Sequence, residues 1–161
     1  MSKGDMFLRI ETLRGGVVAG ESKDSEHPGE IDIEDWSWGM RSTESLAGSG
    51  VAIRTSLSEL RIVKKVDCAS PALMSVMRNN DAVRRAVLSC RKSGGLKPLD
   101  YFTIVVESGR LTMLDVGSGS ASGPHLTESW CIAFEKIAVT YKTQDDKGGA
   151  KAASTFTADI R

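Results

Sequence analysis

The stretch of sequence that decides the fold runs from residue 20 to residue 40 and reads Gly20-Glu21-Ser22-Lys23-Asp24-Ser25-Glu26-His27-Pro28-Gly29-Glu30-Ile31-Asp32-Ile33-Glu34-Asp35-Trp36-Ser37-Trp38-Gly39-Met40. Its first half is rich in acidic residues and turn formers, which is typical of a loop. Its second half contains two of the three tryptophans in the chain. Trp36, Trp38 and Met40 share one face of a strand, so we expect them to be buried. Ser37 then points to the opposite face.

The same period-two alternation recurs along most of the chain and predicts a mainly β protein. Strands are expected at residues 6–11, 30–40, 51–65 (one long strand or a bent pair), 86–90, 101–107, 110–116 and 129–141, with a last edge strand at 154–160. Glycine-rich turns separate most of them. One helix is expected from Pro71 to Asn79, because Ser70 is a good N-cap residue and proline suits the first helical position.

Three of the expected strands change their apolar face partway. The parity of the apolar residues switches between residues 33 and 36, between 57 and 60, and between 134 and 137. A β-bulge absorbs such a switch and curves the sheet toward closure. We therefore expect an all-β fold, a small closed β-barrel built from two sheets with one short flanking α-helix, in a single domain over residues 1–161. A flat two-layer sandwich is the alternative.

The charges are balanced over the whole chain but not along it. The net charge is zero and the pI is near 6.7, so nothing suggests nucleic acid or an anionic membrane as a partner. Residues 21–35 carry a net charge of about −6, and residues 54–92 about +6. These blocks could meet within one subunit, meet across a head-to-tail subunit contact, or form two solvated faces. The candidate interface charges are Glu30, Asp32, Arg84 and Arg85.

Groups that could carry chemistry are sparse. His27 lies among carboxylates, but the spacing matches no compact metal motif. The cysteines at positions 68, 90 and 131 form no Cys-x-x-Cys pair, and we expect them to be reduced and buried. We expect no enzyme activity, no cofactor and no metal. The alternative function is a carbohydrate- or metal-binding β-module, since the two tryptophans could stack on sugar rings.

The start of the chain lacks the apolar core of a signal peptide. No stretch approaches the roughly 20 apolar residues of a membrane span, so we expect no membrane insertion. Any export of the protein is then expected to use a route other than general secretion.

Several motifs together resemble a known family. Residues 20–39 fill every position of the pattern Gly-Glu-Ser-x-Asp-x-x-His, then Glu-Ile-Asp-[Val/Ile], then Trp-Ser-Trp-Gly. Further matches lie, in the family's order, at residues 5–10, 67–73, 88–95, 126–129 and 134–141. On these residues the chain resembles the Hcp family, the haemolysin-coregulated proteins of bacterial type VI secretion.

The resemblance implies a β-barrel subunit that assembles into hexameric rings, which stack into the inner tube of the secretion system. The implied partners are further copies of the chain, effector proteins in the lumen, and the spike and sheath components. The protein is then expected in the cytoplasm while assembled and outside the cell after secretion.

Two regions are candidates for the contacts of such a tube. The segment from residue 40 to residue 50 is expected to be a loop that contributes to ring stacking, with Arg41, Ser42, Thr43, Glu44 and Ser45 as its polar contacts. Ser37 is the candidate for the lumen wall and for cargo contact, because its face of the strand is too polar for a core. An ordinary solvated serine is the alternative.

Overall fold

The computed structural model describes residues 5–45, 52–92, 99–118, 125–144 and 150–160. In these residues the elements are β1 (Met6–Thr12), β2 (Gly16–Val17), β3 (Ile31–Asp32), β4 (Asp35–Ser37), β5 (Met40–Ser45), β6 (Ala52–Leu57), β7 (Leu60–Lys65), α1 (Ala69–Arg78), β8 (Val83–Lys92), β9 (Leu99–Gly117), β10 (Thr127–Ala133), β11 (Lys136–Gln144) and β12 (Ala150–Asp159). The mostly β fold with one short helix is confirmed.

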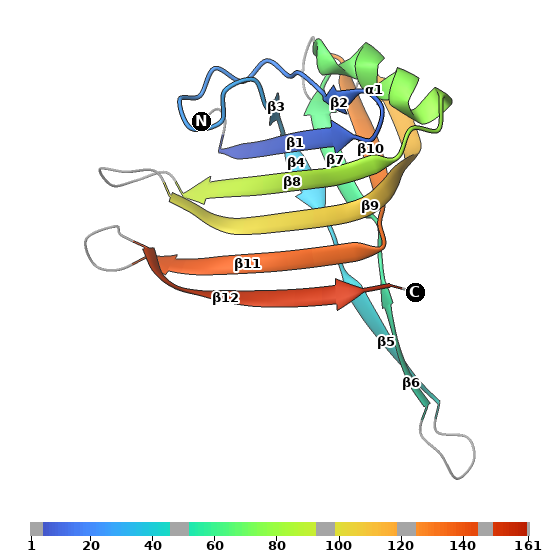
Figure 1. The fold of residues 1–161 in the computed structure, drawn as a ribbon, viewed down its shortest axis with the longest axis vertical. Coiled ribbons are helices and arrows are strands. Elements are labelled where there is room, and N and C mark those ends of the chain that lie inside the picture. Colours follow the sequence, from blue (N-terminus) through green and yellow to red (C-terminus); the bar gives the residue numbers. More distant parts are fainter. Residues whose placement is uncertain (1–4, 46–51, 93–98, 119–124, 145–149, 161) are drawn as a thin grey trace.

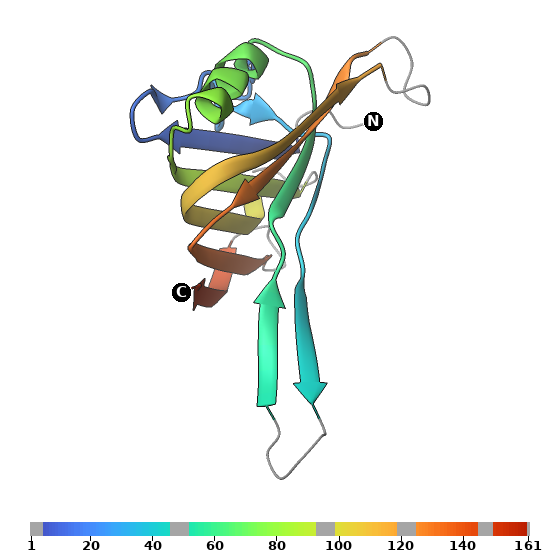
Figure 2. The same ribbon diagram turned by 90° about the vertical axis from the view of Figure 1, so that its right-hand side faces the viewer.

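The strands form one branched antiparallel sheet and one separate ribbon. Ten strands belong to the large sheet, whose main path is β2-β1-β8-β9-β10-β7-β4. β3 pairs with β1, β11 pairs with β9, and β12 pairs with β11. The long strand β9 joins the two halves of this sheet, because its first part pairs with β8 and β11 and its second part with β10. Figures 1 and 2 show these halves crossing, with the β5–β6 ribbon projecting away from them.

The predicted closed barrel is wrong for the part of the chain that the structure describes, which forms two sheets. Each predicted switch of the buried face falls at a break between two strands: β3 and β4, β6 and β7, and β10 and β11. At the first two breaks the chain changes its pairing partner instead of continuing through a bulge, and at the third it moves from the second part of β9 to the first part. β3 and β4 are only two and three residues long, and they pair with β1 and β7 respectively.

Strand β9 also departs from the prediction, which placed a turn at Ser108 and Gly109. The strand runs through both residues, with Ser108 at a φ of 54°. Gly109 is required there, since a Cβ atom would lie 2.2 Å from the carbonyl oxygen of Ala133. The local turn signal therefore marks the point where one strand bends between the two halves of the sheet.

The helix begins at Ala69, two residues before the predicted Pro71, and ends at Arg78. Ser70 is not the N-cap, because it lies inside the helix and is buried. Cys68 holds the N-cap position and makes no side-chain cap. Its backbone N–H donates to the Glu21 carboxylate at 2.6 Å, which satisfies one of the free donors at the helix start. A distant residue thus caps α1.

The core lies between the two halves of the sheet and under α1. Its largest members include Leu8, Ile10, Leu60, Ile62, Leu73, Leu88, Ile104, Trp130 and Ile132. Trp36 and Trp38 are half-buried against this core, and the Trp36 ring stacks on Phe102 at 5.6 Å. The expected burial of Met40 is wrong, since it begins the projecting ribbon and is 50% exposed. Among the described residues, no helix has the length and apolarity that crossing a bilayer requires.

Candidate functional site

The acidic stretch found in the sequence forms a tight loop, residues 20–30, which we term the signature loop. Gly20 donates its backbone N–H to the carbonyl oxygen of Gly29 at 2.8 Å, and Ser22 donates to that of Glu30 at 2.9 Å. A Cβ atom at Gly20 would lie 2.3 Å from the Glu30 carbonyl oxygen. Only glycine therefore permits this approach of the two backbones.

His27 fastens the signature loop to the sheet. Its imidazole is buried and stacks on the Phe7 ring of β1, with ring centroids 4.4 Å apart. Nδ1 lies 3.0 Å from a carboxylate oxygen of Glu30, and Nε2 lies 3.0 Å from one of Asp100 at the start of β9. Two carboxylate acceptors need a donor on each ring nitrogen, so this arrangement fits the protonated imidazolium.

The pKa of His27 follows from these contacts. Burial of the ring lowers this pKa, but the hydrogen bonds to Asp100 and Glu30 outweigh it, and the pKa is raised above the usual 6.5. The imidazolium form is therefore favoured in the folded protein. Both ring nitrogens are used by this contact, which leaves His27 without a free nitrogen for a metal.

Other acids of the signature loop are also used within the chain. Asp24 forms an ion pair with Arg91 of β8 at 2.7 Å, and its pKa is lowered, first by a backbone hydrogen bond from Glu26 and also by Arg91. The Arg91 guanidinium also lies over the Phe7 ring, 5.1 Å from its centroid. The acidic and basic blocks of the sequence therefore meet inside one subunit at this point.

A buried charge network joins α1 to the second half of the sheet. Lys64 and Glu128 are fully buried and form an ion pair. The Lys64 ammonium also donates to Asp67 at 2.8 Å and to the Ser70 hydroxyl at 3.1 Å, and Ser70 donates to Glu128 at 2.6 Å. Removing one charge of such a pair leaves the other buried and uncompensated.

This network was not predicted from the sequence, although a signal for it exists there. Lys64 continues the inward parity of Leu60 and Ile62 on β7. Glu128 continues that of Trp130 and Ile132 on β10. Two opposite charges on core-facing positions of neighbouring strands predict a buried pair.

The loop conformation expected for residues 40–50 is wrong for residues 40–45. Residues 40–45 form strand β5, which pairs in register with β6 from Met40↔Leu57 to Ser45↔Ala52. The remainder of the segment, residues 46–50, lies outside the described residues. Arg41, Ser42 and Thr43 are exposed on the ribbon, and the backbone of Glu44 and Ser45 belongs to the same strand. The ribbon projects from the body of the molecule (Figure 2).

Ser37 and the four candidate interface charges lie on three different strands and in the signature loop. Ser37 is exposed on β4, opposite Arg61 of β7. Asp32 is exposed on β3, and its pKa is raised by desolvation and then by the neighbouring carboxylates of Asp67, Glu21 and Asp24. Arg84 and Arg85 are exposed on β8, whereas Glu30 is held by His27. Among the described residues no ion pair joins the two acidic candidates to the two arginines.

The histidine, cysteine and carboxylate side chains are the groups that could form a metal or thiol site. No group of three or more His, Cys, Asp or Glu side chains in the described residues is arranged to hold a metal ion. The three cysteines are free; Cys90 is buried, Cys131 is half-buried, and Cys68 is exposed, which corrects the expected burial. Burial raises the pKa of the Cys90 thiol.

The fold and these contacts define a β-rich module with a clasped signature loop and a projecting ribbon. A family model described as "Type VI secretion system effector, Hcp" matches residues 7–141. "Protein hcp1" of Pseudomonas aeruginosa PAO1 is 34% identical over 146 residues, which cover 89% of this chain and 86% of that protein. The chain therefore belongs to the Hcp family, the tube proteins of the type VI secretion system. The family is a structural one and not a known family of enzymes.

Solved structures agree with this assignment. A type six secretion system protein of known structure has a TM-score of 0.82 at 19% identity, with 96% of both chains covered. A type VI secretion system effector from Yersinia pestis has a TM-score of 0.75 at 26% identity, covering 97% of this chain and 100% of that one. Hcp2 of Salmonella typhimurium has a TM-score of 0.69 at 24% identity, covering 97% and 95%.

Proposed function

We propose that this chain is the one-domain subunit of hexameric rings that stack into a tube, hold effector proteins in their lumen and leave the cell with them. The observation that carries the proposal is membership of the Hcp family over residues 7–141. The spike and sheath components of the same machine are the further partners, and the type VI machinery is the export route.

The shape of the subunit supports head-to-tail stacking of rings. The β5–β6 ribbon projects from one end of the molecule, and α1 lies at the opposite end (Figure 1). Two unlike ends favour a heterologous contact, which repeats from one ring to the next along a stack.

The ribbon supports the stacking step. Its exposed polar residues, Arg41, Ser42 and Thr43, make no ion pair among the described residues, and the strand pairing holds them away from the body. Because the strand pairing already orders the ribbon backbone, contact with a neighbour costs less conformational entropy than ordering a free loop would. We assign it to the contact between one ring and the next.

Assembly is tested on the purified chain by size exclusion with light scattering, followed by negative-stain electron microscopy. The expected result is a mass of six subunits and ring-shaped particles, with stacked tubes at high protein concentration. A stable monomer that binds a glycan or Ca²⁺ would defeat the proposal and favour the alternative β-module.

The electrostatic part of the ring contact is now best tested at Asp32 and Arg85. Both are exposed, whereas Glu30 is engaged by His27, so changing it would also disturb the fold. Exposed ion pairs weaken as salt screens them, so rings should dissociate more readily at 1 M than at 0.1 M NaCl. Charge reversal at Asp32, or at Arg84 and Arg85, should have a similar effect. Rings that resist both salt and reversal would exclude these residues from the contact.

A further inference from the structure

The two edges of the larger half of the sheet carry different exposed surfaces. Along the order β2, β1, β8, β9, β11 and β12, strand β12 lies at one edge, and β2 lies at the other beside α1 (Figure 1). In the described residues β12 pairs only with β11, so its outer edge is open. Each edge exposes side chains that are not needed to hold a single subunit together.

The β12 edge exposes an apolar surface that continues the core. Ile137 of β11 is buried, and Val139 and Tyr141 follow it on the same face. Phe156 lies opposite Val139 and therefore shares this face. Phe156 and Tyr141 are nevertheless 42% and 43% exposed. The apolar face of the sheet therefore continues beyond the part that other described residues cover.

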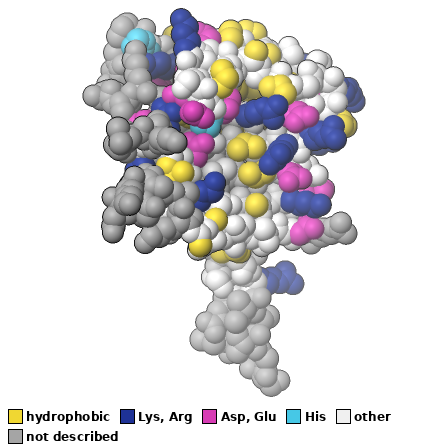
Figure 3. Space-filling view, turned by 60° about the vertical axis from the view of Figure 1, so that its left-hand side comes forward, with side chains coloured by type: hydrophobic (Ala, Val, Ile, Leu, Met, Phe, Trp, Pro, Cys, Tyr) yellow, Lys and Arg dark blue, Asp and Glu magenta, His cyan; other side chains and the backbone are white. Residues whose placement is uncertain are grey.

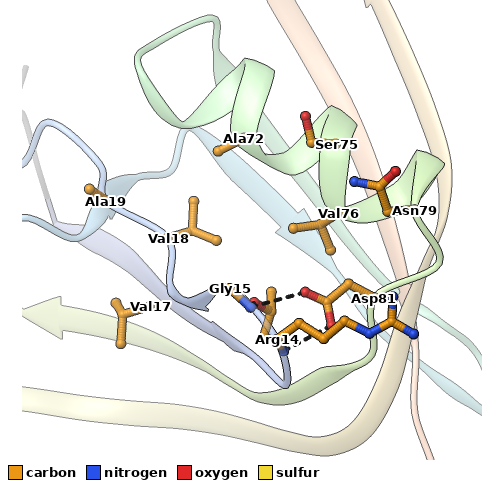
Figure 4. A pocket seen from close by; sticks show the side chains of 11 residues that line it. Arg14, Gly15, Val17, Val18, Ala19, Ala72, Ser75, Val76, Asn79 and Asp81 are labelled. Carbon is orange, nitrogen blue, oxygen red and sulfur yellow. Dashed lines mark hydrogen bonds between the residues drawn. The ribbon is translucent and has the colours of Figure 1, made fainter.

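The opposite edge holds a groove of about 620 Å³ between α1 and residues 14–19 (Figure 4). Ala72 and Val76 line it from the helix, and Val17 and Val18 line it from the other side. At its base the Asp81 carboxylate accepts backbone N–H bonds from Arg14 at 3.1 Å and from Gly15 at 3.2 Å. The small apolar side chains on the two walls therefore form one part of the groove, and the polar side chains of Thr12, Ser75 and Asn79 lie beside them.

Charges on the outer face of the sheet run in an alternating row between these edges. Strand register places five charged residues directly opposite one another, in the order Glu11, Arg85, Glu107, Lys136 and Asp159. Figure 3 shows side chains of both signs alternating along this face. Opposite charges at facing positions stabilise a strand pair. The row ends with a negative charge, Asp159, at the β12 edge, whereas Arg14 supplies a positive charge in the turn beside the groove.

We propose that the β12 edge of one copy packs against the groove of the next, with Phe156 inserted beside Val17 and Val76 and with Asp159 facing Arg14. This inference rests on the proposed ring. A contact between two different surfaces repeats from copy to copy, as a closed ring requires. The Asp159–Arg14 pair continues the alternation of charges from one subunit into its neighbour.

The apolar half of this contact is tested with Phe156→Asp and Ala72→Trp, using light scattering and native mass spectrometry. Both positions are exposed in the subunit, so neither change removes a core side chain. The first removes the inserted ring, and the second fills the groove. Each should raise the concentration at which rings dissociate at least about tenfold, as loss of a central apolar contact does. An unchanged ring in both variants would overturn the proposal.

The Asp159–Arg14 pair is tested by exchanging its two charges. Arg14→Glu and Asp159→Arg should each weaken the ring, and the double variant should restore it because every contact regains an opposite pair. Arg61→Glu is the control, since it reverses an exposed charge on β7 of the other half of the sheet. Absence of rescue in the double variant would exclude the Asp159–Arg14 pairing. Failure of the wild-type chain to form rings would refute the proposed function itself, whereas intact rings in all variants would refute only this inference.

Discussion

The signature loop and the β5–β6 ribbon are both polar and are separated in the sequence only by the short strands β3 and β4, yet the structure uses them in opposite ways. The loop directs three of its ionisable groups to partners on or beside the sheet: His27 contacts Glu30 and Asp100, and Asp24 contacts Arg91. The ribbon directs its polar residues outward and away from the body (Figure 2). The most recognisable motif of the sequence, the signature loop, therefore stabilises the fold and need not be a contact surface.

This comparison separates stability from assembly. Changes in the signature loop should lower the free energy of unfolding, because they break backbone approaches and buried contacts. Changes in the ribbon should leave the free energy of unfolding nearly unaltered and should alter assembly instead. The following experiments test that division, from the largest expected effect to the smallest.

The largest effect is expected from Gly20→Ala. The added Cβ would meet the Glu30 backbone at 2.3 Å, so the loop must shift. We expect a loss of about 3 kcal/mol in the free energy of unfolding, the upper range for overpacking. Gly39→Ala, just before the ribbon, is the matched control; a Cβ there has no neighbouring atom within 4 Å, and the loss should stay under about 0.5 kcal/mol. Urea denaturation measures both, and equal losses would contradict the comparison.

A second prediction concerns the pH dependence of stability. The folded-state pKa of His27 is raised, so the folded chain holds this proton more tightly than the unfolded chain does. The resulting stabilisation is complete below pH about 6.5 and is lost as the pH rises through the folded-state pKa. His27→Gln should cost about 2 kcal/mol at pH 6, the value of charge-assisted hydrogen bonds, and less at pH 9.

The control for this prediction is His125→Gln. His125 is exposed and is the only other histidine in the chain, so its replacement should keep the wild-type pH dependence. Denaturation curves recorded at intervals from pH 5 to 9 provide the measurement. A wild-type slope that persists in His27→Gln would show that another group carries it.

How far the sequence predicts these contacts depends on their range. Alternation predicted β1 and the bent pair β6–β7, because period two follows from the geometry of each strand. It could also have revealed Lys64 and Glu128, whose parity points them inward. Asp100 could not be identified as the partner of His27, since 73 residues separate them. The predicted turn at Ser108 is instead a bend within β9, because strands distant in the sequence pair with β9 on both sides of this residue.

A third prediction addresses the ribbon. Deleting residues 43–44 together with residues 53–54 removes two facing pairs, Thr43↔Arg54 and Glu44↔Ile53, and preserves the alternation of the remaining strand. The free energy of unfolding should change by less than about 0.5 kcal/mol, since Thr43 and Arg54 are exposed and the ribbon projects from the body of the molecule. Rings should still form, while electron micrographs should show no stacked tubes. Loss of the rings themselves would move the ribbon to the contact within a ring.

The smallest effect is expected from Ser37→Arg. Ser37 is exposed on β4, next to the half-buried Trp36 that anchors this strand on Phe102. If its face lines the lumen, a bulky charged side chain should reduce the amount of effector that co-purifies with the ring by about fivefold, equivalent to roughly 1 kcal/mol. Ser25→Arg is the matched control, because Ser25 is exposed in the signature loop on a different part of the surface. Quantitative mass spectrometry of purified rings compares the two variants. Equal retention of effector in both intact rings would place Ser37 on the outer wall, and an equal loss in both would attribute the effect to added charge alone.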